Sequence, residues 1–185
     1  DYVGVQGVGI ADVGDSLTVI KQMIFDEKNL SKEDFLSALQ NDFKSREPLR
    51  QTMIHSVPKY GNDDDRADHW TAYAGEQYCK SVTRPGHVSP FGAKYRPGLF
   101  CLSSNTPLGK QVCALPSGRK AGTPLGDGGV SPKHGMDRLG PTAAAKSVAK
   151  VKHALAINGV NFNLKFMPAM LKTDSDRQKL TDLIR

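Results

Sequence analysis

The stretch LPSGRKAGTPLGDGGVSPKHGMDRLGPTAAAKS, residues 115–147, decides how this chain folds. Glycine and proline are dense in it, yet it is neither a repeat nor a flexible linker. Small residues follow Gly140-Pro141, and proline suits the first turn of a helix. Because glycine permits positive φ and close backbone contact, we expect an ordered, irregular segment that packs tightly and is closed by a small-residue helix.

Length and composition describe one globular domain, or a piece of a larger one. The chain has 185 residues, of which 38% are hydrophobic and 24% are charged. No apolar run approaches twenty residues, so no membrane span is expected. The N-terminus lacks the basic start and apolar stretch of a signal peptide, and we expect both ends to be cut from a longer chain.

The cysteines and the charge distribution argue against a disulfide framework, a zinc site and nucleic-acid binding. The chain has three cysteines, Cys79, Cys101 and Cys113, and their spacing is not that of metal ligands. This predicts reduced thiols in a cytoplasmic protein. Residues 1–70 carry a net charge of −5 and residues 71–185 a net charge of +11. Because the basic residues stand singly among glycines and prolines, nucleic-acid binding is not expected.

Apolar periodicity predicts four helices in the first half of the chain. The first eleven residues are expected to be extended or loop. Asp15 or Ser16 is expected to cap the first helix, and Ser31 the second. Glu47-Pro48 opens the third helix, and the stretch from Asn62 to Asp65, with three carboxylates, marks the start of the fourth.

The second half has fewer regular elements. Leu99–Leu102 is expected to be a strand, and the alternation from Val160 to Phe166 is the clearest strand signal in the chain. The helix after Pro141 should reach about Lys150, with residues 153–157 as a continuation, and a last helix should end the chain. This order favours an α/β fold with too few strands for a self-contained sheet.

Familiar catalytic and ligand-binding motifs fail on spacing. GVGIADVG, residues 7–14, places Asp12 where a dinucleotide loop needs its third glycine, and GTPLGDGG lacks the lysine of a phosphate loop. Asp63–Asp65 lack the alternating ligands of a calcium loop. The histidines are far apart, and neither Ser131 nor Ser147 has the partners of a nucleophile. No catalytic residue and no metal site is assigned.

Several blocks nevertheless resemble the glycyl radical enzyme superfamily, which includes pyruvate formate-lyase, glycerol- and choline-type lyases, arylacetate decarboxylases and fumarate-adding synthases. These blocks are GVGIADVGDSL, PKYGNDDD, LGKQVCALPSGRKAGTPLGDGGVSPKHGMDRLGPTAAAKSVAK and NGVNFNLKFMP. Together with shorter matches they span nearly the whole chain in order. One departure is Ser117, where members of the superfamily usually carry Asp.

The resemblance implies an α/β fold that is part of a ten-stranded barrel, helix-rich and with long ordered Gly/Pro loops. In that barrel one loop carries a thiyl-forming cysteine and another carries the radical glycine. Residues 1–185 are expected to lie between the cysteine loop and the C-terminal glycine-radical domain. Neither a Gly-Cys-Val-Glu-like nor an Arg-Val-Ala-Gly-Tyr-like motif occurs in the sequence.

The resemblance also implies cofactors and partners. No cofactor is expected on this chain; the parent protein would hold a glycyl radical, installed by a separate activating enzyme that uses S-adenosylmethionine and an iron–sulfur cluster. Its partners would be the rest of the parent barrel, the activating enzyme, a small organic substrate and a second copy in a homodimer.

By position, the resemblance implies five residues that line the substrate pocket: Val8, Ile10, Ser104, Asn105 and Thr106. The alternative is that they only pack the barrel wall. No carboxylate or arginine is among them, which favours a fairly apolar substrate.

The implied activity is radical hydrogen abstraction by a lyase: a dehydratase, a decarboxylase or a C–N lyase. A fumarate-adding aryl- or alkylsuccinate synthase and a formate C-acetyltransferase-like enzyme are the alternatives. A non-catalytic binding or scaffold domain is the alternative of another class. This chain alone is expected to be inactive.

Overall fold

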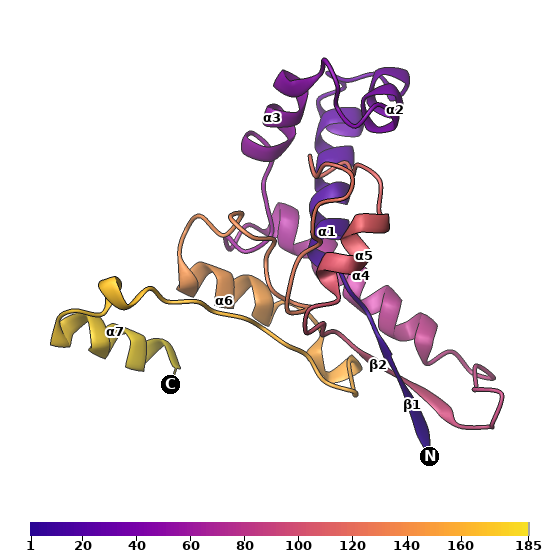
Figure 1. Cartoon of the computed structure of the whole chain (residues 1–185), viewed down its shortest axis with the longest axis vertical. Helices are drawn as coiled ribbons and strands as arrows, with labels where there is room; N and C mark the ends of the chain where they lie inside the picture. Colours follow the sequence, from indigo (N-terminus) through magenta and orange to yellow (C-terminus); the bar gives the residue numbers. More distant parts are fainter. Residues whose placement is uncertain (185) are drawn as a thin grey trace.

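The computed structural model describes residues 1–184 of the chain. The elements follow in this order: β1 (Tyr2–Gln6), α1 (Ile10–Val19), the π-helix η1 (Ile20–Asp26), α2 (Lys32–Gln40), α3 (Glu47–His55), α4 (Asp65–Val82), β2 (Lys94–Gly98), α5 (Asn105–Gln111), α6 (Pro141–Ala149), the 3₁₀-helices η2 (His153–Leu155) and η3 (Pro168–Met170), and α7 (Asp174–Ile184). Figure 1 shows α2 and α3 at one end of the molecule and the strands at the other.

Helices α1 and α4 form the centre of the structure and cross closely (Figure 1). Gly14 of α1 is buried against α4, and a Cβ atom built on it would lie 2.7 Å from the Cα atom of Thr71. Backbone therefore meets backbone at this crossing. A glycine is required there by space, since the helix itself imposes no unusual φ.

The two strands pair in parallel, with Tyr2 opposite Lys94 and Gln6 opposite Gly98. They are the only sheet within residues 1–184. Parallel strands need a long crossover, and α1 to α4 supply it. Because strands of parallel sheets are normally covered on both faces, the exposure of Tyr2 and Val3 marks a sheet that is incomplete in this segment.

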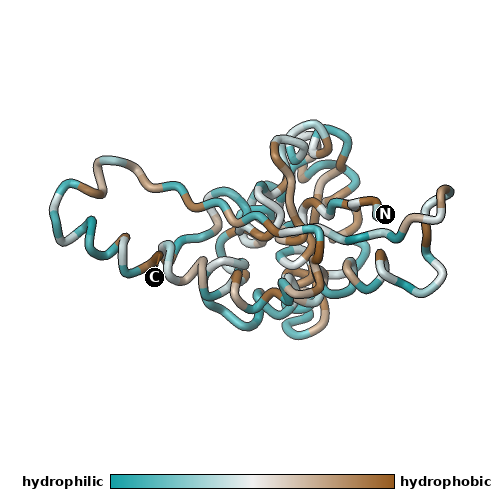
Figure 2. The backbone as a smooth tube through the Cα atoms, turned by 90° about the horizontal axis from the view of Figure 1, so that it is seen from below, coloured by the Kyte–Doolittle hydropathy of each residue, from teal (hydrophilic) through white to brown (hydrophobic). Residues whose placement is uncertain are grey.

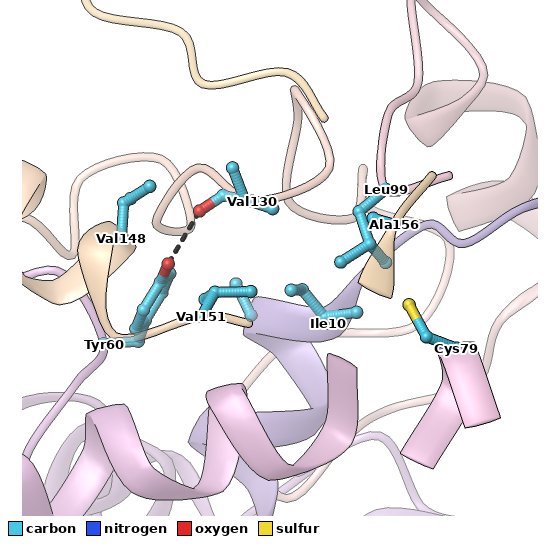
Figure 3. Packing of buried hydrophobic residues seen from close by; sticks show 9 residues of the cluster. Ile10, Tyr60, Cys79, Leu99, Val130, Val148, Val151 and Ala156 are labelled. Atoms are coloured by element: carbon cyan, nitrogen blue, oxygen red, sulfur yellow. Dashed lines mark hydrogen bonds between the residues drawn. The ribbon is translucent and has the colours of Figure 1, made fainter. Parts of the chain in front are cut away.

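Two hydrophobic clusters fill the interior. One joins η1, α2 and α3 and is centred on Val19, Phe43 and Met53. The other joins the end of the sheet to α1, α4 and the segment after α6. In this second cluster the hydroxyl group of Tyr60 donates a 2.8 Å hydrogen bond to the Val130 carbonyl oxygen (Figure 3).

The glycine-rich segment, residues 115–140, is ordered and packs against the second cluster, as expected. Gly129 shows why a side chain is excluded: its φ is +98°, and a Cβ atom there would lie 2.6 Å from the Cα atom of Phe100. The next residue, Val130, is fully buried. The segment is closed by α6, which begins at Pro141.

Most predicted helices are confirmed. Ser31 caps α2 by accepting the Asp34 N–H, and Asp64 caps α4 by accepting the Arg66 N–H. Helices α3 and α7 lie where they were expected. The helix after Pro141 ends at Ala149, and only a 3₁₀ turn continues it.

The start of α1 corrects the sequence analysis. The helix begins at Ile10, after Gly9 in the left-handed conformation, and neither Asp15 nor Ser16 caps it. Both lie inside the helix and are buried. Their polar groups serve contacts with distant segments, which a local capping pattern cannot reveal. The preceding chain is extended, as expected, and forms β1.

Both predicted strands are also wrong. The strand β2 ends at Gly98, one residue before the predicted strand of Leu99–Leu102, and Leu102 is 85% exposed. From Val160 to Phe166 the chain makes only isolated bridges, Val160 with Leu99 and Asn161 with Gly129. The alternation of apolar and polar residues from 160 to 166 therefore belongs to an extended chain that pairs with no neighbouring strand within residues 1–184.

The α/β, helix-rich character is confirmed, whereas a ten-stranded barrel is not visible in residues 1–184. The segment leading to α7 extends away from the rest, and Figure 2 shows it reaching to one side. No residue of α7 is buried. None of the described helices combines the length and apolar character needed to cross a bilayer.

We predict that Gly14→Ala lowers the free energy of unfolding by about 2 kcal/mol, because the added methyl group overpacks the α1–α4 crossing. Urea denaturation of the protein measures this change. Gly75→Ala in α4 is the matched control, since its Cβ atom would meet its nearest neighbour at 3.5 Å, an ordinary contact. Alanine there should be neutral or slightly stabilising. Equal effects at the two positions would contradict the close crossing.

Candidate functional site

The ends of β1 and β2 bring the two predicted pocket segments to the same edge of the sheet. Because the strands are parallel and in register, both carboxyl ends lie together. The Gly7 N–H donates to the Gly98 carbonyl oxygen at 2.8 Å and extends the pairing beyond β1. Val8 and Ile10 follow β1, and residues 104–106 follow β2. Ligands of open parallel sheets bind at such an edge.

Leu125 of the glycine-rich segment connects the two loops. Its N–H donates to the Asn105 carbonyl oxygen at 3.2 Å, and its own carbonyl accepts from the Asn105 Nδ2 atom at 3.3 Å. Its side chain lies against Gly9, where a Cβ atom would be 3.6 Å away. The segment after β2 is thereby fixed relative to the segment after β1.

The five predicted residues differ in exposure. Ile10 is 5% exposed and packs into the hydrophobic cluster that also contains Leu99 and Val151 (Figure 3). Val8, Ser104 and Asn105 are half-buried, and Thr106 is exposed. The structure therefore brings the two segments to one edge but gives their side chains different surroundings.

Val8 and Ile10 border an apolar groove of about 490 Å³ between α1 and α4. Val13, Leu17, Tyr73 and Tyr78 complete much of its wall. The Tyr78 hydroxyl group donates to the Val5 carbonyl oxygen at 2.9 Å, which fixes the ring beside the end of β1. Residues 104–106 do not border this groove.

Buried carboxylates on α1 hold the glycine-rich segment in place. Asp12 is 1% exposed; its Oδ1 atom pairs with the Lys133 ammonium group at 2.9 Å, and its Oδ2 atom accepts the Gly126 N–H at 2.6 Å. Ser16, one turn later, accepts the Ser117 N–H at 3.3 Å. A buried carboxylate is stable only with such partners. Asp12 therefore holds a cationic side chain and a backbone N–H of the glycine-rich segment against α1.

Asp15, on the same helix, is a second buried carboxyl group, and the charge of the buried Lys59 acts on it from the segment before α4. The Oδ1 atom of Asp15 accepts the Tyr60 N–H at 2.9 Å. Burial raises the pKa of Asp15 to about 7, and Lys59 opposes this shift. Burial also lowers the pKa of Lys59 to about 8. Burial thus shifts both pKa values toward neutral pH, that of Asp15 from below and that of Lys59 from above.

Arg119 organises the glycine-rich segment from within. Its guanidinium group donates to the carbonyl oxygens of Val112, Cys113 and Gly109 at 3.2, 2.9 and 2.6 Å, and also to those of Thr123 and Pro124. A segment without regular secondary structure needs such donors for its buried carbonyl groups. Arg119 is 3% exposed and serves this structural role.

The sequence analysis missed the buried polar residues Asp12, Asp15, Lys59, Arg119 and Lys133. The partners of Asp12 and Asp15 are 45 to 121 residues away, so no local spacing reveals them. Arg119 donates to carbonyl groups within ten residues, in a segment without regular secondary structure. Two features of the sequence could have indicated these residues. Asp12 and Asp15 lie three positions apart among apolar residues, and the glycine-rich segment cannot satisfy its backbone groups by regular secondary structure.

The described residues contain no cluster of three or more His, Cys, Asp or Glu side chains arranged to hold a metal ion. Cys79 and Cys101 are buried, and burial raises the pKa of both thiols. Cys113 is exposed. The edge with its groove therefore offers apolar surface, hydroxyl groups and an amide, which can bind and orient a small molecule.

This chain is similar to known proteins along nearly its whole length. A family described as "Pyruvate formate lyase-like" matches residues 1–109, and one described as "Glycine radical" matches residues 127–185. The chain is 42% identical to the "Probable dehydratase YbiW" of Escherichia coli over all of its length and 24% of that protein. It is 34% identical to the trans-4-hydroxy-L-proline dehydratase of Clostridioides difficile, over 98% of the chain and 22% of that enzyme.

Solved structures give the same result. The glycerol-bound form of the B12-independent glycerol dehydratase from Clostridium butyricum superposes with a TM-score of 0.92 at 42% identity, over 100% of this chain and 23% of that one. The hydroxyproline dehydratase of Clostridioides difficile gives a TM-score of 0.90 at 34% identity, over 98% and 23%. The chain thus spans about a quarter of the length of these relatives.

We predict that Asp15→Asn removes a pH-dependent loss of stability. Because the pKa of Asp15 is raised by folding, wild-type protein should lose stability as pH rises from about 4 through about 7, by up to about 4 kcal/mol relative to the variant. Urea denaturation at several pH values measures the difference. Glu33→Gln also removes one carboxyl group, from the exposed surface of α2, and as the control should change the pH dependence far less. A flat difference for Asp15→Asn would contradict the buried carboxyl group.

Proposed function

Since this chain belongs to the pyruvate formate lyase-like family, we propose that it is part of the catalytic subunit of a glycyl radical enzyme, a lyase acting by radical hydrogen abstraction. The observation that carries the proposal is the 42% identity over the whole chain to a probable dehydratase and to a glycerol dehydratase. Other relatives named as a sulfopropanediol dehydratase and as isethionate sulfite-lyases support elimination over other outcomes.

We further propose that the chain lies between the thiyl-cysteine loop and the loop that carries the radical glycine, in a ten-stranded barrel. The order of the two family matches supports this position, with the glycine radical match at the C-terminal end. The exposed, incomplete parallel sheet fits a segment whose neighbouring strands come from the rest of the barrel.

The substrate class in this proposal is a small organic molecule that bears a hydroxyl group and a second leaving or activating group. Glycerol, 1,2-propanediol, trans-4-hydroxy-L-proline and isethionate, named for relatives, share a hydroxyl-bearing carbon. Fumarate addition and formate C-acetyl transfer remain alternatives; a formate acetyltransferase of Haemophilus influenzae is 28% identical to the chain.

The radical of the parent protein supplies hydrogen abstraction, and this chain's own residues supply walls and position. Backbone meets backbone at Gly14 and at Gly129, which leaves no room for solvent at these two contacts. Excluding water protects reactive intermediates from side reactions. We propose that Val8, Ile10, Ser104, Asn105 and Thr106 line the pocket, with the hydroxyl and amide groups orienting substrate hydroxyls.

The proposed partners are the rest of the parent barrel, a second copy in a homodimer and a separate activating enzyme that uses S-adenosylmethionine and an iron–sulfur cluster. The proposed setting is the cytoplasm of an anaerobic cell.

The full-length protein, activated without oxygen, should show the electron paramagnetic resonance signal of an organic radical and then eliminate water or sulfite from one member of a substrate panel. The panel is glycerol, 1,2-propanediol, trans-4-hydroxy-L-proline and isethionate, with products followed by NMR. Product formed only from pyruvate and coenzyme A, or from fumarate and a hydrocarbon, would support the two alternative reactions instead. A protein that acquires no radical would support the scaffold class.

Pocket lining is tested by Val8→Ala in the same assay. If Val8 borders the substrate, the ratio of kcat/KM values for a larger and a smaller substrate should change by roughly tenfold. Val88→Ala is the matched control, because Val88 is 49% exposed and borders a different cavity. The same kcat/KM ratio in Val8→Ala as in wild type would contradict the pocket assignment.

A further inference from the structure

A second cavity, of about 200 Å³, lies between α1, α3 and the glycine-rich segment. It is separate from the groove at the strand ends, and the two share no residue. Its charged and polar side chains are those of Asp15, Arg50, Ser117, Arg119, Lys120, Thr123 and Lys133.

Two of these wall residues are almost fully buried and carry an atom that lacks a partner. Asp15 is fully buried and Ser117 is 5% exposed. Among the described residues, neither the Oδ2 atom of Asp15 nor the Oγ atom of Ser117 has a hydrogen-bond partner. Because nearly all buried polar groups in folded proteins are satisfied, two orphaned groups on one cavity indicate a polar occupant.

The charge of the wall indicates the sign of that occupant. Four wall residues are cationic and one is acidic. Glu47 pairs with Arg50 at 2.6 Å and with Lys120 at 3.6 Å. Arg119 donates only to backbone carbonyl groups, and no ion pair of Arg119 occurs within residues 1–184. A metal cation would be repelled by this wall, whereas an anion would be attracted.

Donor groups remain available for an anion. Arg50 uses its Nε and Nη2 atoms on Glu47 and its Nη1 atom on the Gly118 carbonyl oxygen, which leaves one hydrogen on each terminal nitrogen. The Lys133 ammonium group has Asp12 at 2.9 Å as its carboxylate partner. The Ser117 hydroxyl group has no hydrogen-bond partner within residues 1–184. We propose that this cavity binds a small oxyanion, held by Ser117, Arg50 and Lys133.

Asp15 makes this binding pH-dependent. It faces Lys59 and the Tyr60 N–H from the segment before α4, Asp12 on its own helix, and Lys133 from the glycine-rich segment. Burial raises the pKa of Asp15 to about 7. When protonated, its carboxyl group becomes a donor to the cavity; when ionised, it repels an anion. Affinity should therefore fall as pH rises through about 7.

The test uses inorganic sulfate as the probe, because its charge does not change between pH 6 and pH 9. The full-length protein is titrated with sulfate by calorimetry, with sodium chloride at equal ionic strength as the comparison. We expect saturable binding that chloride does not reproduce, weaker at pH 8.5 than at pH 6. Absence of saturable binding, or an equal response to chloride, would overturn the proposal.

Two variants locate the site. Ser117→Asp puts a carboxylate into the cavity and should weaken sulfate binding at least tenfold. Ser175→Asp makes the same charge change on exposed α7 and should leave binding unchanged. Ser117→Ala removes only the hydroxyl donor and should weaken binding several-fold in a folded protein. Wild-type affinity in both Ser117 variants would show that sulfate binds elsewhere and would refute the assignment.

Discussion

The buried carboxylate of Asp12 is the interaction on which the rest of the structure depends. A carboxylate that is 1% exposed can persist only with charged and hydrogen-bonding partners, and both come from residues more than a hundred positions away. Lys133 and the Gly126 N–H thereby fix the glycine-rich segment against α1. The segment needs this fixing because it has almost no regular backbone pairing of its own.

The arrangement of the strand ends follows from that fixing. Leu125 lies next to Gly126 in the chain, and it bonds to Asn105 while packing on Gly9. Holding Gly126 on Asp12 therefore holds the loop after β2 beside the loop after β1. The apolar groove at Val8 is shaped by the packing of α1 against α4. The second cavity is instead lined mainly by charged side chains, four of them cationic. The two cavities thus offer different chemistry within one short segment.

Local signals in the sequence were sufficient for most helices, but they misplaced the start of α1 and gave no indication of α5. Ser31 and Asp64 act as caps because capping depends on residues a few positions apart. The ordered glycine-rich segment and the small-residue helix after it were also predicted. Family membership was predicted from the resemblance of whole sequence blocks to the superfamily. Two parallel strands and their common edge could be inferred only with the structure.

The failures have a shared physical cause. Asp15 was expected to cap a helix because aspartate often does, but its partner is Tyr60, 45 residues later. The alternation from Val160 to Phe166 records an extended chain, yet a strand also needs a neighbour, which this segment does not contain at that place. Long-range pairing was invisible in both cases.

The separation between α1 and its partners has a consequence for synthesis on the ribosome. Asp12 is made 121 residues before Lys133, and translation proceeds at about 5–20 residues per second. For roughly 6 to 24 s, α1 is therefore complete while the cation that pairs with Asp12 does not yet exist. During that interval an unpaired Asp12 carboxylate is better left in water than buried, which opposes closure over this face of α1 until the glycine-rich segment emerges.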